Sequence, residues 1–164
     1  NQRHEESADW RTIIMSLNNI FAISGSAMSA QTVRLNTVAS NIANADSVAS
    51  SADQTYRARK PVFEQMMTDA LRESGWNASE DLVSGASGMG VRVAGIVESD
   101  APLEPRYEPN SPMANEEGYV FYPNVNPVEE MADMMSASRS FQTNVEIMNS
   151  AKSMMQRMLT LGQS

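Results

Sequence analysis

MSAQTVRLNTVASNIANAD, residues 28–46, is the stretch that decides the fold of this chain. Its apolar residues follow one another at a spacing of three or four positions: Leu35, Val38, Ile42 and Ala45. This spacing predicts an α-helix with one apolar stripe, and the amides Asn41 and Asn44 lie beside that stripe. A helix of small residues and amides is suited to close packing against another helix rather than to burial in one large core.

A second segment of comparable periodicity lies near the other end of the chain, at residues 128–161. Its apolar residues have the same spacing: Val128, Met131, Met134, Phe141, Val145, Met148, Ala151, Met155 and Leu159. Asn126 can cap this helix and Pro127 suits its first position. The helix would be roughly 50 Å long at 1.5 Å per residue, more than a small domain can cover. We therefore expect the two terminal helices to pair as an antiparallel coiled-coil hairpin.

The middle of the chain is expected to be β-rich. Strands are predicted at residues 56–63, 91–98 and 119–122, where β-forming side chains predominate or alternate. Four prolines between residues 102 and 112 predict an extended connection with turns. Residues 64–90 are interpreted as a Gly/Ser-rich insertion, with a short helix possible from 64 to 72.

The predicted fold class is α+β, with two long helices and a small β-rich middle segment. We expect four parts along the chain: an extension at 1–14, the N-terminal helix at 15–46, the middle segment at 47–123 and the C-terminal helix at 124–164. Residues 1–14 are more polar than the rest and are interpreted as an upstream extension or alternative start. The alternative is an ordered arm that contacts a neighbour through Trp10 and Ile13.

Composition excludes several classes of function. The 164 residues carry a net charge of −8, which argues against a general binder of nucleic-acid backbones. The chain has no cysteine, so disulfides and thiolate metal sites are excluded. Its single histidine has no second ligand nearby, and the glycine-rich run at 84–90 lacks the lysine of a phosphate-binding loop. The adjacent Glu129 and Glu130 would point to different faces of a helix. We therefore expect no enzyme, cofactor or metal site.

The chain also lacks the signals of a membrane or secretory protein. No stretch reaches the roughly 18 apolar residues of a membrane-spanning helix. None has the basic, apolar and small-residue pattern of a secretory signal peptide. We expect a protein that does not span the membrane and that, if exported, leaves the cytoplasm without a cleavable signal.

Two terminal segments carry a family resemblance. SAQTVRLNTVASNIANAD, residues 29–46, resembles the N-terminal signature of the bacterial flagellar axial proteins, the family of rod and hook subunits. PNVNPVEEMADMMSASRSFQTNVEIMNSAKSMMQRMLTLGQ, residues 123–163, is similar to the C-terminal helix of the basal-body rod proteins in that family. Shorter similarities are YRAR at 56–59, VRVAGI at 91–96 and GYV at 118–120. The resemblance covers about residues 15–163.

This resemblance implies a structural role in the bacterial flagellum. The terminal helices would line the inner tube of the proximal rod, and the middle segment would contact neighbouring subunits. The assembled rod would transmit motor torque across the periplasm, and its subunits would be exported unfolded by the flagellar type III system. Implied partners are further copies of the chain, the rod proteins FlgB, FlgF and FlgG, the basal-body protein FliE and the P-ring.

We expect the subunit interface to use the apolar stripes and their flanking amides. Its predicted residues are Leu35, Val38, Asn41, Ile42, Asn44, Met131, Met134, Arg139, Phe141, Asn144, Val145, Met148, Met155 and Leu159. The amides would fix the register between subunits at some cost in stability. Arg57, Arg59 and Lys60 form the densest basic patch, which either contacts an acidic neighbour or is a solvated strand face.

One alternative uses the same helices for another purpose. A coiled-coil adaptor or export chaperone would bind a client through them in a complex of defined stoichiometry. Concentration-dependent assembly into tubes or lattices, as opposed to a one-to-one complex, would distinguish a rod subunit from such an adaptor.

Overall fold

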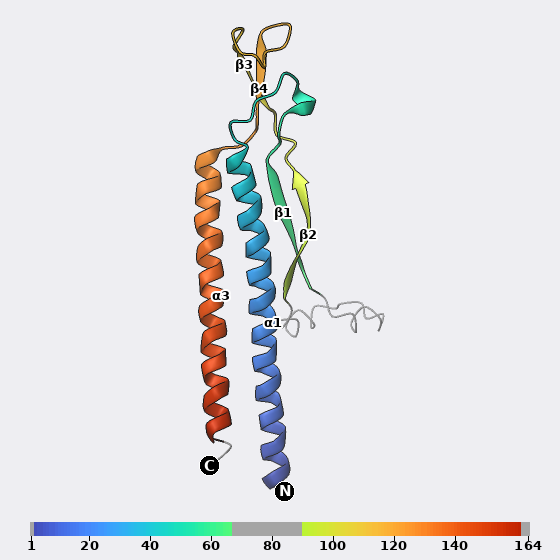
Figure 1. The fold of residues 1–164 in the computed structure, drawn as a ribbon. Helices are drawn as coiled ribbons and strands as arrows, with labels where there is room; N and C mark the ends of the chain where they lie inside the picture. The colour runs from blue at the N-terminus through green and yellow to red at the C-terminus, as the bar shows by residue number, and fades with distance from the viewer. Residues whose placement is uncertain (1, 67–89, 162–164) are drawn as a thin grey trace, which may run out of the picture. The chain divides into compact units, whose positions relative to one another are not determined.

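The computed structural model describes residues 2–66 and 90–161, and the side chains of residues 16–66 and 90–160. Two long helices, α1 (Gln2–Ala43) and α3 (Pro127–Leu161), lie towards the two ends of the chain (Figure 1). Between them in sequence are the short helix η1 (Ala52–Gln54) and the strands β1 (Arg59–Gln65), β2 (Val91–Glu98), β3 (Glu104–Tyr107) and β4 (Tyr119–Tyr122). The strands form two separate two-stranded sheets, β1 with β2 and β3 with β4. The predicted α+β class, with two long helices packed together and small β hairpins between them, is confirmed.

The chain divides into two compact units, and each long helix contributes residues to both. Unit 1 comprises the described residues of Asn1–Ala30, Phe63–Arg92 and Ser140–Ser164. Unit 2 comprises Gln31–Val62 and Val93–Arg139.

Unit 2 has a core of small side chains. Its buried apolar residues are Val38, Ala49, Ala58, Val120 and Ala137, and its buried polar residues are Thr37, Asn41, Thr55 and Glu130. No aromatic side chain is among them. Since small side chains let backbones approach closely, this composition explains how α1, β1 and α3 can share one narrow core.

The β3–β4 hairpin contains a proline that the sequence pattern did not predict to lie in a strand. Pro105 is opposite Phe121 in the antiparallel register. The N–H and C=O groups of Phe121 both bond to Ala49 on its other side, at 2.9 and 3.1 Å. Pro105 and Phe121 therefore form an opposed pair that exchanges no hydrogen bonds. The N–H group that proline lacks is not needed at this position. The predicted irregular connection at 102–112 is thus in part a strand.

In unit 1, Ser26 joins α1 to the start of β2. Its hydroxyl donates to the Ile23 carbonyl at 2.8 Å and accepts the Val91 N–H at 3.1 Å. Gly90 lies directly against it, because a Cβ at this position would be 2.3 Å from the Ser26 hydroxyl oxygen. The buried residues of this unit are again small or aliphatic: Leu17, Ser24, Ala30 and Ala151.

Three of the four ends of the long helices lie within three residues of their predicted positions. The predicted cap of α3 is confirmed, because Asn126 Oδ1 accepts the Val128 N–H at 3.1 Å and Pro127 is the first helical residue. α1 ends at Ala43, three residues before the predicted end at residue 46, and α3 ends at Leu161. The expected start of the first helix at residue 15 is wrong, because α1 is already helical from Gln2. The predicted helix at 64–72 begins inside β1 and otherwise lies, like most of the 64–90 insertion, outside the described residues.

Candidate assembly surface

A buried amide organises unit 2. Asn41 is 1% exposed, and its Nδ2 donates to the Arg59 carbonyl at 2.8 Å and to Glu130 Oε2 at 3.0 Å. Its Oδ1 accepts the Tyr56 hydroxyl and the Arg59 N–H, both at 2.9 Å. Since the N–H and C=O of Arg59 have fixed polarity, they determine which way the amide is oriented. One side chain thus connects α1, the start of β1 and the first turn of α3.

A second amide fixes the β segments of the same unit. Asn124 Oδ1 accepts the Ala58 N–H at 2.7 Å, and its Nδ2 donates to the Ser99 and Ala101 carbonyls at 3.2 and 2.9 Å. The sequence did not single out Asn124, which was assigned to the predicted C-terminal helix at 124–164, whereas α3 begins at Pro127.

An ion pair holds α1 against α3 in unit 2. The Arg34 guanidinium bonds to both carboxylate oxygens of Asp133, with Nε at 3.2 Å from Oδ2. This two-point geometry is the strongest form of an arginine–carboxylate contact. Arg34 precedes Asn41 on α1, while Asp133 follows Glu130 on α3, so the helices run antiparallel. The predicted antiparallel hairpin is therefore present in this unit.

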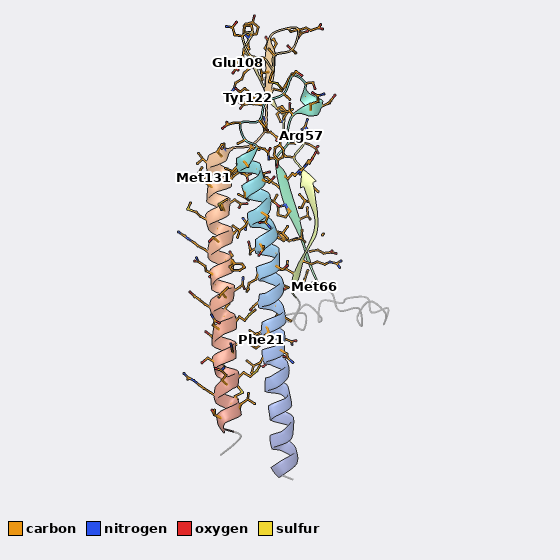
Figure 2. All side chains as sticks on the ribbon, in the orientation of Figure 1. Phe21, Arg57, Met66, Glu108, Tyr122 and Met131 are labelled. Carbon is orange, nitrogen blue, oxygen red and sulfur yellow. The ribbon has the colours of Figure 1, made fainter. Side chains whose placement is uncertain are left out.

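The three basic residues near the start of β1 differ in their surroundings. Arg57 Nη1 donates to the Ser99 and Ala101 carbonyls at 3.2 and 3.3 Å (Figure 2). Arg59 pairs with Glu98 across the sheet at 3.2 Å and lies 5.5 Å from the Tyr56 ring centre. Lys60 is exposed. Arg57 is thus a positive charge held in place by carbonyls, next to two exposed cationic side chains.

The outer side of α3 in unit 2 carries an exposed apolar stripe. Val128 is 75% exposed, Met131 53% and Met135 59%, and they follow one another at spacings of three and four. Glu130 and Asp133, which bond to α1, lie on a different side of the same helix. Three large apolar side chains on one exposed helix face form a contiguous patch of the kind found at protein interfaces.

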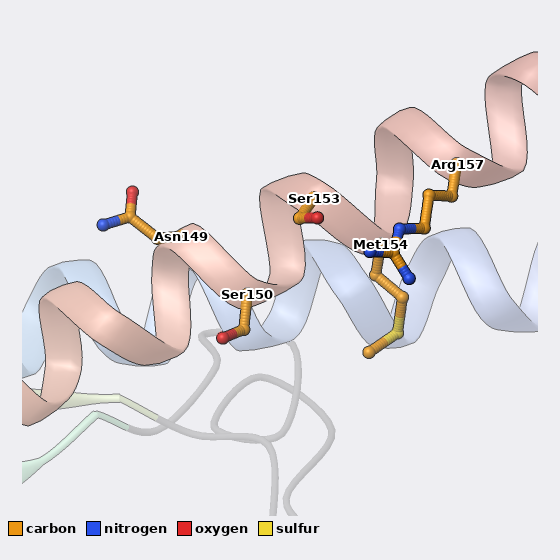
Figure 3. A pocket seen from close by; sticks show the side chains of 5 residues that line it. All are labelled: Asn149, Ser150, Ser153, Met154 and Arg157. Atoms are coloured by element: carbon orange, nitrogen blue, oxygen red, sulfur yellow. The ribbon is translucent and has the colours of Figure 1, made fainter.

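A groove between α1 and α3 in unit 1 is also largely apolar. It has a volume of about 370 Å³, and its lining includes Leu17 and Ile20 from α1 with Ile147, Ala151 and Met154 from α3. A neighbouring recess along α3 is lined by Asn149, Ser150, Ser153, Met154 and Arg157 (Figure 3). In that view Ser150 and Met154, one helical turn apart, project from the same side of the helix. Met154 belongs to both hollows.

The predicted interface residues fall into three groups. Val38 and Asn41 are buried. Met131, Arg139 and Leu159 are exposed, as are Arg59 and Lys60 of the basic patch. The remaining predicted residues are half-buried: Leu35, Ile42, Asn44, Arg57, Met134, Phe141, Asn144, Val145, Met148 and Met155.

The amides predicted to lie at the subunit interface have hydrogen-bond partners within the chain. Both polar atoms of Asn41 are engaged within the chain, as described above. Asn44 and Asn144 each donate to the carbonyl four residues earlier, from Ser40 and Ser140, at 2.8 Å. The structure thus assigns the most buried of these amides to the interior of the fold.

Sequence reasoning missed several exposed apolar residues as interface candidates. They are Ile20, Val128, Met135, Ile147 and Met154. Their helical spacing was visible, but spacing alone does not say which of two adjacent stripes faces the partner helix.

The β3–β4 hairpin carries a tyrosine with a perturbed pKa. The Tyr122 hydroxyl donates to Glu108 Oε1 at 3.1 Å, and the Arg106 guanidinium lies 4.3 Å from the Tyr122 ring centre (Figure 2). The bond to Glu108, with partial burial, raises the Tyr122 pKa above 10.0 because the phenolate could not donate to this carboxylate. Since the folded-state pKa is the higher one, the bond stabilises the fold below pH 10.0 and is lost as the pH rises through the raised pKa.

We expect Tyr122 to be protonated at pH values where a free tyrosine has begun to ionise. Subtracting the ultraviolet titration of Tyr122→Phe from that of the unchanged chain isolates this residue among the four tyrosines. Glu108→Ala, which removes the acceptor, should move the isolated transition to lower pH. A Tyr122 transition at or below pH 10.0 in the unchanged chain would contradict the assignment.

Within residues 2–66 and 90–161, no helix combines the length and apolar character needed to cross a membrane. In the same part of the chain, no group of three histidine, cysteine, aspartate or glutamate side chains could hold a metal ion.

Comparison with known proteins gives consistent matches. The family model "Flagella basal body rod protein" matches residues 21–49, and "Flagellar basal body rod FlgEFG protein C-terminal" matches residues 116–161. The flagellar basal-body rod protein FlgC of Salmonella typhimurium is 48% identical over 149 residues, which cover 91% of this chain and 100% of that protein. Its counterpart in Escherichia coli O6:H1 is 50% identical over the same shares of both chains. The FlgC protein of Bacillus subtilis is 39% identical over 156 residues, covering 92% and 99%.

Proposed function

The chain belongs to the FlgC family of flagellar basal-body rod proteins, and we propose that it builds the proximal rod through the exposed faces of its helical hairpin. It is a structural component of the basal-body rod and not an enzyme, and it assembles with other rod proteins. We further propose its specific neighbours: copies of itself, FlgB, FlgF, FlgG, FliE and the P-ring. Export by the flagellar type III system and transmission of motor torque belong to the same proposal.

The observation that carries this proposal is the exposed stripe of Val128, Met131 and Met135. Burying a side chain of this size is worth about 1.5–3 kcal/mol, so leaving all three in water is a substantial cost for an isolated chain. Covering them with a neighbouring subunit recovers that free energy. Methionine also adapts to small differences in register between subunits, as a helical lattice requires.

We propose two roles for the predicted interface residues. The buried Val38 and Asn41 hold the hairpin together, so that it presents a rigid surface. The exposed Met131 and Leu159, with the half-buried stripe residues, contact neighbouring subunits. Residues 15–46 and 124–164 would then form the inner part of the rod, and residues 47–123 its outer part.

Substitution of Met131 by aspartate tests the interface directly. Because Met131 is 53% exposed, the change should leave the stability of the free chain within about 0.5 kcal/mol. It should nevertheless reduce swimming several-fold and lower the yield of rods, because a charge would be buried against the neighbour. Motility in soft agar, rod yield in isolated basal bodies and the exported amount of the chain are the measurements.

Met131→Leu is the matched control, since it keeps an apolar side chain of similar volume and should retain motility. Normal swimming of the aspartate variant would show that this face of α3 does not lie in an interface.

A further inference from the structure

The loop of the β3–β4 hairpin is rigid. Asn115 Oδ1 accepts the Glu117 and Tyr119 N–H groups at 3.0 and 2.8 Å, and the Asn115 N–H donates to the Tyr119 carbonyl at 2.9 Å. Gly118 has a φ of +82°, which glycine adopts without strain. A Cβ there would be 2.8 Å from the Tyr107 ring, so the ring packs directly over the glycine. The loop is therefore ordered before any partner binds.

This rigid loop displays aromatic and apolar side chains to solvent. Tyr107 is 64% exposed and packs edge-to-face against Tyr119, with ring centres 5.3 Å apart. Met113, on the same loop, is also exposed. Aromatic side chains that are ordered in advance lose little conformational entropy on binding, and tyrosine is enriched among residues that dominate binding energies. We call residues 107–119 the hairpin tip.

The hairpin is also acidic. From residue 104 to residue 122 it contains four glutamates and one arginine, and that arginine already pairs with Glu104 at 3.3 Å. Glu116 and Glu117 lie in the tip and are exposed. A partner for the tip should therefore combine positive charge with apolar surface.

The same unit offers a surface with this combination. Lys60 and Val62 lie two residues apart on β1 and therefore point to the same face of the β1–β2 sheet. The Ser99 N–H bonds to the Ala58 carbonyl, and Arg59 pairs with Glu98, so Val97 lies opposite Lys60 on that same face. All three side chains are exposed, and together they are called the basic ribbon.

We propose that the hairpin tip of one copy docks on the basic ribbon of the next copy in the rod. Glu116 and Glu117 would approach Lys60, while Tyr107 would cover Val62 and Val97. Two different surfaces then meet at each contact, which is the kind of interface that builds an open assembly. Charge complementarity would fix the orientation of neighbouring copies. This inference rests on the proposed function, since it requires copies of the chain to be neighbours.

Disulfide trapping tests the contact because the chain has no cysteine of its own. Two variants, Lys60→Cys and Glu117→Cys, are produced together in one strain, each with a different tag. We expect a disulfide-linked dimer carrying both tags in isolated basal bodies, formed in the oxidising periplasm. Each variant produced alone should give no disulfide-linked dimer. Val62→Cys and Glu116→Cys provide three further pairings that tolerate small errors in the docked geometry.

Absence of a mixed dimer in all four pairings, in cells that swim normally, would overturn the docking proposal and leave the rod function intact. A tip that contacts a different rod protein would give this same negative result. Failure of the proposed function would give a different result from failure of the docking proposal. In that case Met131→Asp would leave rod assembly unchanged.

Exchange of charges gives an independent readout. Lys60→Glu and the pair Glu116→Lys with Glu117→Lys should each reduce swimming several-fold, because like charges then meet at the contact. Their combination in one chain should restore swimming to within about twofold of the unchanged protein, since opposite charges meet again. Additive losses in the combined variant would contradict the proposal.

Discussion

Replacing Asn41 with leucine is expected to lower the free energy of unfolding by about 3–5 kcal/mol and to abolish rod assembly. The leucine would leave the N–H and C=O of Arg59, the Tyr56 hydroxyl and the Glu130 carboxylate without the partners they have now. Each such loss in a buried position costs roughly 1–3 kcal/mol, and water entering the site would recover part of it. Urea unfolding followed by circular dichroism, together with swimming, measures the two effects.

Asn44→Ala is the matched control for this experiment. Asn44 is the neighbouring amide on α1, and its side chain donates to the Ser40 carbonyl one turn earlier at 2.8 Å. Its removal should cost less than about 1 kcal/mol. Similar losses for both substitutions would show that the buried network contributes little beyond an ordinary helix hydrogen bond.

Ala137→Leu is expected to destabilise the hairpin by about 2–3 kcal/mol through overpacking. Ala137 is 0% exposed and lies two turns beyond Glu130 on α3. The extra carbon atoms have no free volume to occupy, so they would push α3 out of its position in unit 2. The same unfolding measurement applies, and swimming should be strongly reduced.

Ala132→Leu makes the same chemical change at an exposed position five residues earlier. It should change the free energy of unfolding by no more than about 0.5 kcal/mol. An equal effect at the two sites would mean that leucine acts through helix propensity or surface hydrophobicity rather than through packing.

Much of this fold follows from local sequence features. The spacing of apolar residues predicted both long helices, and the cap at Asn126 was predicted because its side chain acts on the N–H two residues away. The strands β2 and β4 were predicted at their observed bounds. Alternating apolar residues indicated β2, and a short aromatic run that ends before Pro123 indicated β4. In these cases the deciding interactions are local.

The remaining features depend on contacts distant in sequence. The strand around Pro105 exists because Ala49 takes the hydrogen bonds of Phe121 on the other side. The role of Asn41 depends on its hydrogen bonds to Tyr56, Arg59 and Glu130. The sequence around Asn41 does not predict these partners. Likewise, periodicity located an apolar stripe on α3 but could not distinguish the side facing α1 from the exposed side at Met131. Propensity and spacing contain no information about such partners.

The contacts that join α1 to α3 have a consequence for the timing of folding. Arg34 pairs with a residue 99 positions later, and Asn41 with one 89 positions later. The entropy of closing such a long loop is lost before these contacts are gained, so they form late and only after both segments are available. A chain that emerges from a channel end-first therefore cannot close its hairpin until most of its length has passed through. Premature folding in transit is disfavoured by topology alone, and a truncated chain would never form the surface on which assembly depends.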